Sequence, residues 1–179
     1  YITAQLLGAM FGQLLVVMTH KPYYVKTENP NAILGSFSTI SAVDDGTKES
    51  HKAAWINGFL NEFLGSFVLF FSAMALTKNY FGAELLAKLT AAGYDASTAA
   101  TQVAPFTTGS LAVAHLGLGF LVMTLVASLG GPTGPGLNPA RDLGPRIVHA
   151  LLPKSILGEY KGDSKWWYSW VPVVAPILA

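Results

Sequence analysis

Long apolar stretches alternate with polar segments along this chain of 179 residues. The first stretch has no charged side chain in its first 19 residues, the second contains a single glutamate, and the third a single histidine. Each is close to or above the roughly 20 residues that a helix needs to cross the hydrocarbon core of a bilayer. A fourth stretch is still apolar where the sequence stops. We therefore predict membrane spans at about 1–23, 53–77, 106–129 and, cut short, 166–179.

The composition supports a membrane protein. Hydrophobic residues make up 51% of the chain and charged residues 12%, about half the charged share of soluble domains. The absence of cysteine excludes disulfides and thiolate metal sites, and the four histidines show no ligand spacing, so we expect no metal and no cofactor. A net charge of +1 gives no indication of nucleic-acid binding. The sequence starts at Tyr1 without a basic flank, so we interpret it as part of a larger membrane protein rather than a signal peptide.

Three polar segments separate the apolar stretches. Residues 21–52 contain Asn-Pro and Asp-Asp-Gly turn signals and are predicted to form a long loop. Residues 78–105 are predicted to contain a short amphipathic helix at 83–92, followed by a linker of small residues. The third polar segment follows the span that ends at residue 129 and carries the most informative pattern of the chain.

That segment begins with five glycines and prolines among residues 130–135 and leads to Asn138 and Pro139. Asn138 is a good helix N-cap, and proline at the first helical position loses no hydrogen bond. The Gly/Pro run before it forms neither a helix nor a strand, so its carbonyls need polar partners. At membrane depth, irregular backbone is tolerated only beside protein or water. We therefore predict a re-entrant loop and half-helix over residues 130–151, with the positive end of the half-helix facing an aqueous path.

The motif Asn138-Pro139-Ala140-Arg141, placed after a Gly-rich loop at the end of a span, resembles the signature of the major intrinsic proteins, the aquaporin and glycerol-facilitator family. The resemblance covers nearly the whole chain. Asp142, Arg146 and the pair Pro172-Val173 are similar to the aquaglyceroporin branch rather than to strict water channels.

The resemblance implies an all-α membrane protein: a right-handed bundle of six tilted transmembrane helices plus two re-entrant half-helices, built as an inverted repeat. This chain corresponds to the third span through the start of the sixth. It also implies a homotetramer in the plasma membrane with one pore in each subunit. Residues 21–52 and the re-entrant loop then lie outside and residues 78–105 inside, although the distribution of Lys and Arg favours the opposite orientation.

A pore for small neutral solutes must replace lost hydration with a few hydrogen-bonding groups. We expect the Asn138 amide to donate near mid-membrane, and Arg141, with the half-helix dipole, to raise the barrier for cations and protons. An alternative role for Arg141 is an ion pair that holds the loop, with Asp142 or Glu62. The acceptors for solute hydroxyls are expected to be the carbonyls of Gly134, Pro135, Gly136 and Leu137.

By matching positions, the family's narrow filter would use Val126 and Pro135 beside Arg141. The best-known glycerol facilitators have glycine and an aromatic residue at the first two positions. Valine in place of glycine narrows one wall of the filter and proline in place of an aromatic ring widens another, so these two residues do not fix the width of the aperture. Water-selective members carry histidine at the position of Val126. The absence of that histidine argues against a strict water channel. Leu69 and Val122 match positions of the pore wall.

Glu62 is a carboxylate among apolar residues and needs partners. The resemblance implies that it braces the re-entrant loop by accepting backbone N–H bonds, with Asp142 as a second structural support. His115 lies near the start of its span, where it would either gate the inner mouth by titration or make an ordinary interfacial contact.

The predicted function is a passive channel for glycerol and other small uncharged solutes, with water, in contact with the lipid bilayer. A water-preferring pore and one permeable to lactic acid, urea or hydrogen peroxide remain alternatives. A proton-coupled transporter with a broken helix is an alternative of another class, for which Glu62 is the only membrane acid. The sequence shows no catalytic pair of a nucleophile and a base with a supporting motif, so we do not expect an enzyme.

Overall fold

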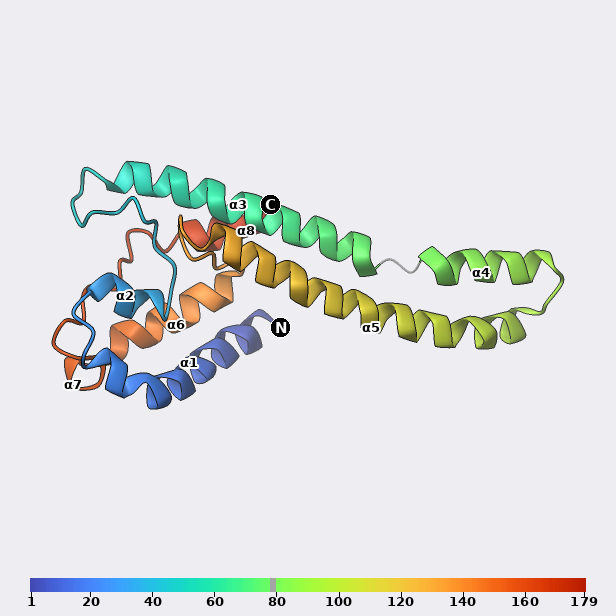
Figure 1. The fold of residues 1–179 in the computed structure, drawn as a ribbon, viewed down its shortest axis with the longest axis horizontal. Coiled ribbons are helices and arrows are strands. Elements are labelled where there is room, and N and C mark those ends of the chain that lie inside the picture. The colour runs from blue at the N-terminus through green and yellow to red at the C-terminus, as the bar shows by residue number, and fades with distance from the viewer. Residues whose placement is uncertain (78–79) are drawn as a thin grey trace. The chain divides into compact units, whose positions relative to one another are not determined.

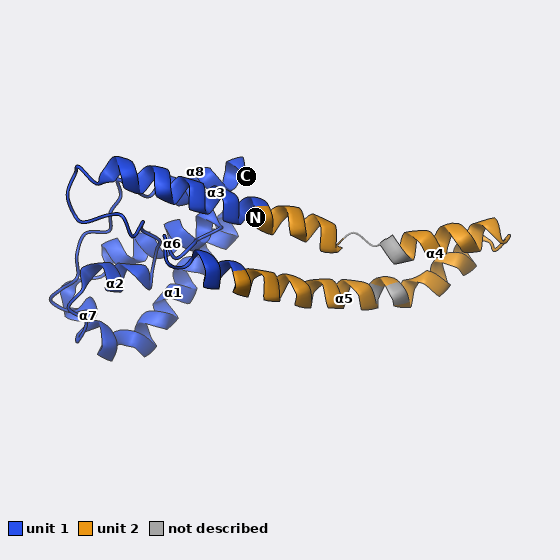
Figure 2. Cartoon of the chain, turned by 45° about the horizontal axis from the view of Figure 1, so that its top comes forward, with its two compact units in different colours: residues 1–67, 125–179 blue, residues 68–124 orange. Residues whose placement is uncertain are grey.

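A computed structural model of the chain describes residues 1–77 and 80–179. These residues form helices joined by turns and loops, and none of them forms a strand. They divide into two compact units, residues 1–67 with 125–179 and residues 68–124 (Figure 2). The predicted all-α class is therefore correct for the described part of the chain.

The first unit holds both chain ends and most of the helices labelled in Figure 1. It contains α1 (Ile2–Tyr24), α2 (Pro30–Gly35), the first part of α3 (His51–Thr77), the end of α5 (Ala96–Leu129), α6 (Pro139–Leu151), α7 (Lys154–Leu157) and α8 (Val171–Leu178). The second unit contains the rest of α3 and α5 together with α4 (Tyr80–Ala91).

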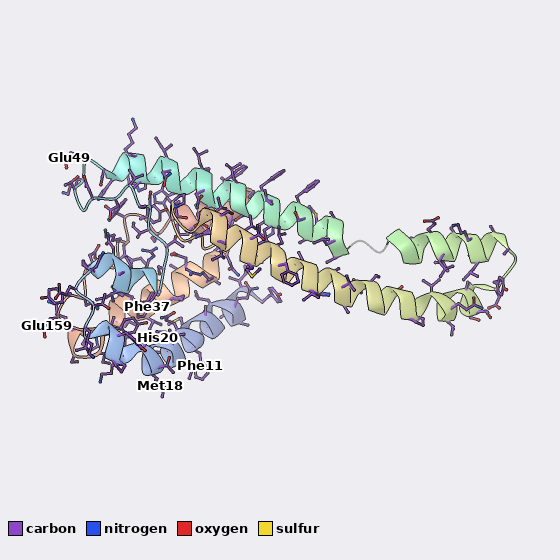
Figure 3. All side chains as sticks on the ribbon, viewed as in Figure 1. Phe11, Met18, His20, Phe37, Glu49 and Glu159 are labelled. Atoms are coloured by element: carbon purple, nitrogen blue, oxygen red, sulfur yellow. The ribbon has the colours of Figure 1, made fainter. Side chains whose placement is uncertain are left out.

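Among the described residues, α1, α3 and α5 are long and apolar enough to cross a membrane. Their outward side chains are mostly apolar. Phe11 and Met18 project from α1 (Figure 3) and are 65% and 75% exposed. Side chains of this kind suit the contact of a spanning helix with lipid tails rather than with water.

α5 begins ten residues before the span predicted at 106, so the prediction of a linker up to Pro105 is wrong. The carboxylate of Asp95 accepts hydrogen bonds from the backbone N–H groups of Ser97 and Thr98, both at 3.0 Å, and from the Ser97 hydroxyl. These bonds to the side chains and backbone of Ser97 and Thr98 hold the pKa of Asp95 well below its usual range. A carboxylate cap at this point starts the helix, and Pro105 lies inside it.

The last helix, α8, starts at Val171, five residues after the predicted start of its span. Residues 166–170 form turns instead, with the Tyr168 N–H donating to the Lys165 carbonyl and the Ser169 N–H to the Trp166 carbonyl. The apolar stretch is therefore longer than the helix that it contains.

The core of the first unit lies where α1, α2, α6 and α7 meet. α1 and α6 pack closely, because a Cβ built on Gly144 of α6 would lie 3.0 Å from the Leu6 carbonyl oxygen and 3.1 Å from the Ala9 Cβ. Glycine at this position lets the two backbones approach. The buried side chains of this cluster are Val17, Tyr24, Ile33, Phe37, Val148 and Leu157.

Candidate channel lining around the half-helix

The chain between α5 and α6 is irregular and partly strained. Gly134 has φ +61° and Leu137 has φ +52°. Glycine adopts such a conformation freely, whereas for leucine it costs about 1–3 kcal/mol. Backbone strain of this kind persists only where surrounding contacts hold the segment, and here those contacts come from α3.

Glu62 of α3 makes these contacts. Its carboxylate accepts hydrogen bonds from the backbone N–H groups of Gly136 and Leu137, both at 2.9 Å, and its side chain is fully buried. The hydroxyl of Thr133 donates to the same carboxylate at 3.4 Å and accepts from the Asn61 amide at 2.6 Å. The carboxylate thus ties consecutive residues of the loop to a long helix.

These hydrogen bonds engage the backbone N–H groups of the loop but not its carbonyls. The N–H of Gly134 donates to the Gly130 carbonyl at 2.9 Å, and those of Gly136 and Leu137 are taken by Glu62. Within the described part of the chain, none of the carbonyls of residues 134–137 accepts a hydrogen bond. The donors of this segment are therefore satisfied by the protein, while its carbonyls have no partner among the described residues.

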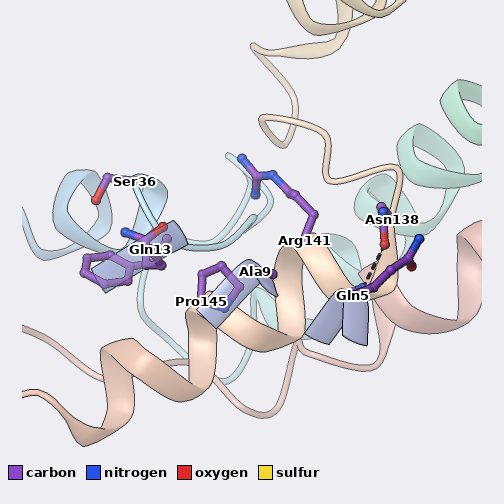
Figure 4. A pocket seen from close by; sticks show the side chains of 9 residues that line it. Gln5, Ala9, Gln13, Ser36, Asn138, Arg141 and Pro145 are labelled. Carbon is purple, nitrogen blue, oxygen red and sulfur yellow. Dashed lines mark hydrogen bonds between the residues drawn. The ribbon is translucent and has the colours of Figure 1, made fainter. Parts of the chain in front are cut away.

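α6 starts as the sequence predicts, with Asn138 as N-cap and Pro139 as the first helical residue. The Asn138 side-chain oxygen accepts from the Ala140 N–H at 2.9 Å, as the dashed line in Figure 4 shows. Because the oxygen is engaged by the helix start, the NH₂ group is the part of the amide left to donate. The unpaired N–H groups and the dipole of α6 add positive potential at the same place.

A cavity of about 340 Å³ lies beside this helix start, between α1, α2 and α6 (Figure 4). Arg141 is exposed and, among the described residues, donates no side-chain hydrogen bond and forms no ion pair, so the alternative of a loop-holding salt bridge with Asp142 or Glu62 has no support. Its guanidinium remains free to donate into the cavity. The residues that line the cavity are Gln5, Ala9, Gln13, Ser36, Phe37, Asn138, Ala140, Arg141 and Pro145.

Asp142 pairs with Arg146 instead. Both side chains are fully buried, and the guanidinium donates to both carboxylate oxygens, at 2.9 and 3.1 Å. It also donates to the carbonyls of Thr39 and Ser164, each at 2.7 Å, and to that of Lys165 at 3.3 Å. The Thr39 N–H donates back to Asp142 at 2.7 Å. This pair therefore fastens the loops before α3 and before α8 to the half-helix.

Other residues of the predicted filter lie apart from the cavity. Val126 is 49% exposed and Pro135 is buried, and neither lines the cavity beside Arg141. Leu69 and Val122 belong to the second unit. The roles assigned to these four residues stay predictions.

Sequence reasoning missed several residues of this region. Thr39 and Ser38, whose hydroxyl donates to the Asp142 carbonyl at 3.0 Å, come from a loop without periodicity and gave no signal. Asn61 and Gln13 are polar residues within apolar helices. The cost of burying such amides could have marked both as residues in need of a partner.

The family model of the major intrinsic proteins matches residues 80–179, more than half of the chain. The chain belongs to the major intrinsic protein family. Its three long apolar helices fit the helical membrane channels of that family and make it a multi-pass membrane protein. The Asn-Pro-Ala-Arg motif of residues 138–141 falls inside the matched region.

Curated relatives agree with this assignment. The chain is 62% identical to the glycerol facilitator-aquaporin of Lactococcus lactis subsp. cremoris, covering 100% of this chain and 65% of the relative. It is 40% identical to a glycerol uptake facilitator protein-like 5 of Lactiplantibacillus plantarum, with 99% and 56% covered, and 39% identical to a glycerol uptake facilitator protein of Streptococcus pneumoniae, with 99% and 58% covered. The chain thus spans less than two thirds of the length of these relatives. No solved structure gives a significant match to this member of the major intrinsic proteins.

Proposed function

We propose that this protein is a passive channel of the plasma membrane that conducts glycerol and other small uncharged solutes together with water. The observation that carries the proposal is the one-sided hydrogen bonding of residues 134–137. Their carbonyls accept no hydrogen bond from any residue that the structure describes, while the N–H groups of Gly136 and Leu137 are held by Glu62. The relatives are named glycerol facilitators or glycerol uptake facilitators, which supports the same solute class.

Each hydroxyl of a polyol needs an acceptor when it leaves water. In the proposed pathway, the four carbonyls accept from these hydroxyls in succession, and the NH₂ group of Asn138 donates to their oxygens. A solute without charge is adequately solvated by such groups, because neutral hydroxyls both donate and accept.

Ions are excluded by the same helix start. The N-terminus of α6 carries the equivalent of about half a positive charge, and the guanidinium of Arg141 adds a full positive charge. A cation or a proton at this point meets repulsion from both. Glu62, the acid nearest to the loop, already has both oxygens bound to backbone N–H groups, which argues against a proton relay and hence against a proton-coupled transporter.

Which solute is preferred depends on the filter, and water, lactic acid, urea and hydrogen peroxide fit the same chemistry. We also propose that the protein assembles as a homotetramer with one pore in each subunit. It needs no cofactor in this role and performs no catalysis.

The test is stopped-flow swelling of proteoliposomes that contain the full-length protein, in a glycerol gradient and in a water gradient. We expect glycerol entry to be faster than in protein-free vesicles, with no decay of an imposed pH gradient. An Arg141→Val variant tests the exclusion of ions separately. It should conduct protons or cations while retaining glycerol flux. Absence of accelerated entry for every small neutral solute would refute the proposal, and uptake that requires a proton gradient would favour the transporter.

A further inference from the structure

Asn61 is a polar residue in the apolar stretch of α3, directly before Glu62. Its side chain is buried, and its Nδ2 donates to two acceptors, the hydroxyl of Thr133 at 2.6 Å and the carbonyl of Leu129 at 3.3 Å. The burial of an amide costs free energy unless its polar atoms are bonded. Both hydrogens of the NH₂ group are therefore committed to the chain between α5 and α6.

The two acceptors lie at the start of the loop that leads to the half-helix. Leu129 is the last residue of α5, so its carbonyl has no partner within that helix. Thr133 directly precedes Gly134, where the chain turns with φ +61°. Asn61 thus joins the end of α5 to the residue before the turn, and it fixes the point at which the carbonyls of residues 134–137 begin.

The hydrogen bonds run in one direction. A carbonyl only accepts, so Asn61 presents its nitrogen rather than its oxygen to Leu129, and the same NH₂ group reaches Thr133. The hydroxyl of Thr133, which accepts from Asn61, gives its single hydrogen to Glu62 at 3.4 Å. Glu62 in turn binds backbone N–H groups at the far end of the loop. Amide, hydroxyl and carboxylate therefore connect the two ends of the loop through α3.

Gly65 adds an apolar contact to the same two ends. It lies one turn after Asn61 on α3 and hence on the same face of the helix. A Cβ built on Gly65 would lie 2.7 Å from Cδ2 of Leu137 and 2.8 Å from Cδ1 of Leu129. The missing side chain lets both leucines pack against α3. A shift of the end of α5 along α3 would consequently disturb this packing as well as the hydrogen bonds of Asn61.

We propose that Asn61 is a positioning residue of the conduction path, which sets the spacing between the end of α5 and the carbonyls of residues 134–137. This inference rests on the proposed function, because the spacing of these carbonyls matters only if solutes pass them. Glu62 holds the end of the row through Gly136 and Leu137, and Asn61 holds its start. Asn61 acts through Thr133 and Leu129, and its role requires no contact with the solute.

Glycerol depends on this spacing more than water does. Its hydroxyls are linked by a carbon chain, so several acceptors must lie at matching separations. A single water molecule binds one acceptor at a time and finds replacement partners in its neighbours. The quantity that reports on Asn61 is therefore the ratio of glycerol to water permeability. A residue that only supports the fold would change both permeabilities together through the amount of folded protein.

The experiment measures both permeabilities per folded protein for Asn61→Leu in proteoliposomes of the full-length protein. Leucine keeps a similar volume and removes the donors. We expect glycerol permeability to fall about three- to tenfold, as for the loss of one hydrogen bond between neutral groups, while water permeability changes less than about twofold. Asn29→Leu is the matched control, because this exposed asparagine caps α2 through the N–H groups of Asn31 and Ala32. It should lower stability and leave the ratio unchanged.

A double variant tests whether Asn61 acts through Thr133. Thr133→Val keeps the shape of the side chain and removes the hydroxyl. Adding Asn61→Leu to Thr133→Val should lower the ratio by less than Asn61→Leu does in the wild type, because the two residues share one hydrogen bond. If Asn61→Leu does not fold, Thr133→Ser keeps the hydroxyl and should retain a higher ratio than Thr133→Val.

An unchanged ratio in Asn61→Leu would overturn the inference, as would an equal fall in Asn29→Leu. Independent effects of Asn61→Leu and Thr133→Val, or equal ratios in the two Thr133 variants, would also overturn it. Failure of the proposed function is recognised separately, since the wild type itself would then not accelerate glycerol entry.

Discussion

Glu62→Gln tests the anchoring of the loop most directly, because it changes one atom and almost no volume. The carboxylate accepts two backbone N–H bonds of 2.9 Å, from Gly136 and Leu137. Glutamine has a single acceptor oxygen, so one N–H bond is lost and the new NH₂ group lies against a buried N–H donor. Thr133 also loses its charged acceptor.

The magnitude follows from these contacts. A hydrogen bond to a charged group contributes about 1.5–3 kcal/mol, and a buried donor left without a partner costs about 1–3 kcal/mol. Both values include the cost of leaving the backbone N–H without an acceptor, so they are not added in full. We expect a loss of about 3 kcal/mol in the free energy of unfolding. For a chain of this size each kcal/mol lowers the melting temperature by about 2–4 °C, which gives about 6–12 °C. The strained φ of Leu137 should relax once its N–H is released.

The measurement is thermal unfolding in detergent, combined with glycerol flux in proteoliposomes at a temperature where the variant is folded. If the proposed function is correct, flux should fall because Gly136 and Leu137 lose the acceptor that holds this segment in place. Glu84→Gln is the matched control, since the ion pair of Glu84 with Lys88 is exposed and should contribute nothing measurable. A Glu62→Gln variant with the melting temperature and flux of the wild type would refute the role assigned to the carboxylate.

Three further predictions concern the surroundings of the half-helix. Arg146→Met leaves the Asp142 carboxylate buried without its cation and should cost about 3–5 kcal/mol, seen as lost detergent-stable protein, and a variant with normal stability would contradict the network. Gly58→Ala places a methyl group against the hydroxyl group of Tyr168 and should destabilise by about 1–3 kcal/mol; thermal unfolding should show partial recovery in the double variant with Tyr168→Phe, and full additivity would count against the clash. Burial, the largest cause, together with nearby cations lowers the pKa of His149 to about 4, below the value of about 6.5 in an unfolded chain. The unfolded state therefore binds the proton first, so the melting temperature should fall as pH drops from about 6.5 towards 4, and His149→Gln should flatten this dependence.

Local signals in the sequence were sufficient for the half-helix. Asn138 and Pro139 specify a helix start by their own backbone and side-chain chemistry, and the glycines and prolines before them exclude regular structure. Both effects act within a few residues, so no knowledge of the fold is needed. The start of α5 was misjudged for the opposite reason: alanine, serine and threonine are compatible with either a linker or a helix, and the cap at Asp95 decides between them.

Long-range partners could not be predicted in the same way. Arg146 binds carbonyls of Thr39, Ser164 and Lys165, which any residue type at those positions would supply. A main-chain acceptor leaves no trace in the sequence, so only the buried cation itself was visible. The alternative ion pair of Arg141 with Asp142 is not formed, because Asp142 is taken by the arginine one turn further along the helix.

The carbonyls of residues 134–137, to which no described residue donates, have a consequence for how fast a molecule could travel past them in the proposed pathway. Consecutive peptide oxygens are chemically identical, so in the proposed pathway a permeant would exchange one acceptor for another of the same kind. Because these groups belong to the main chain, side-chain substitution along the segment alters its width far more than its hydrogen-bonding chemistry. Conduction along such a wall would tolerate sequence drift that a row of polar side chains would not.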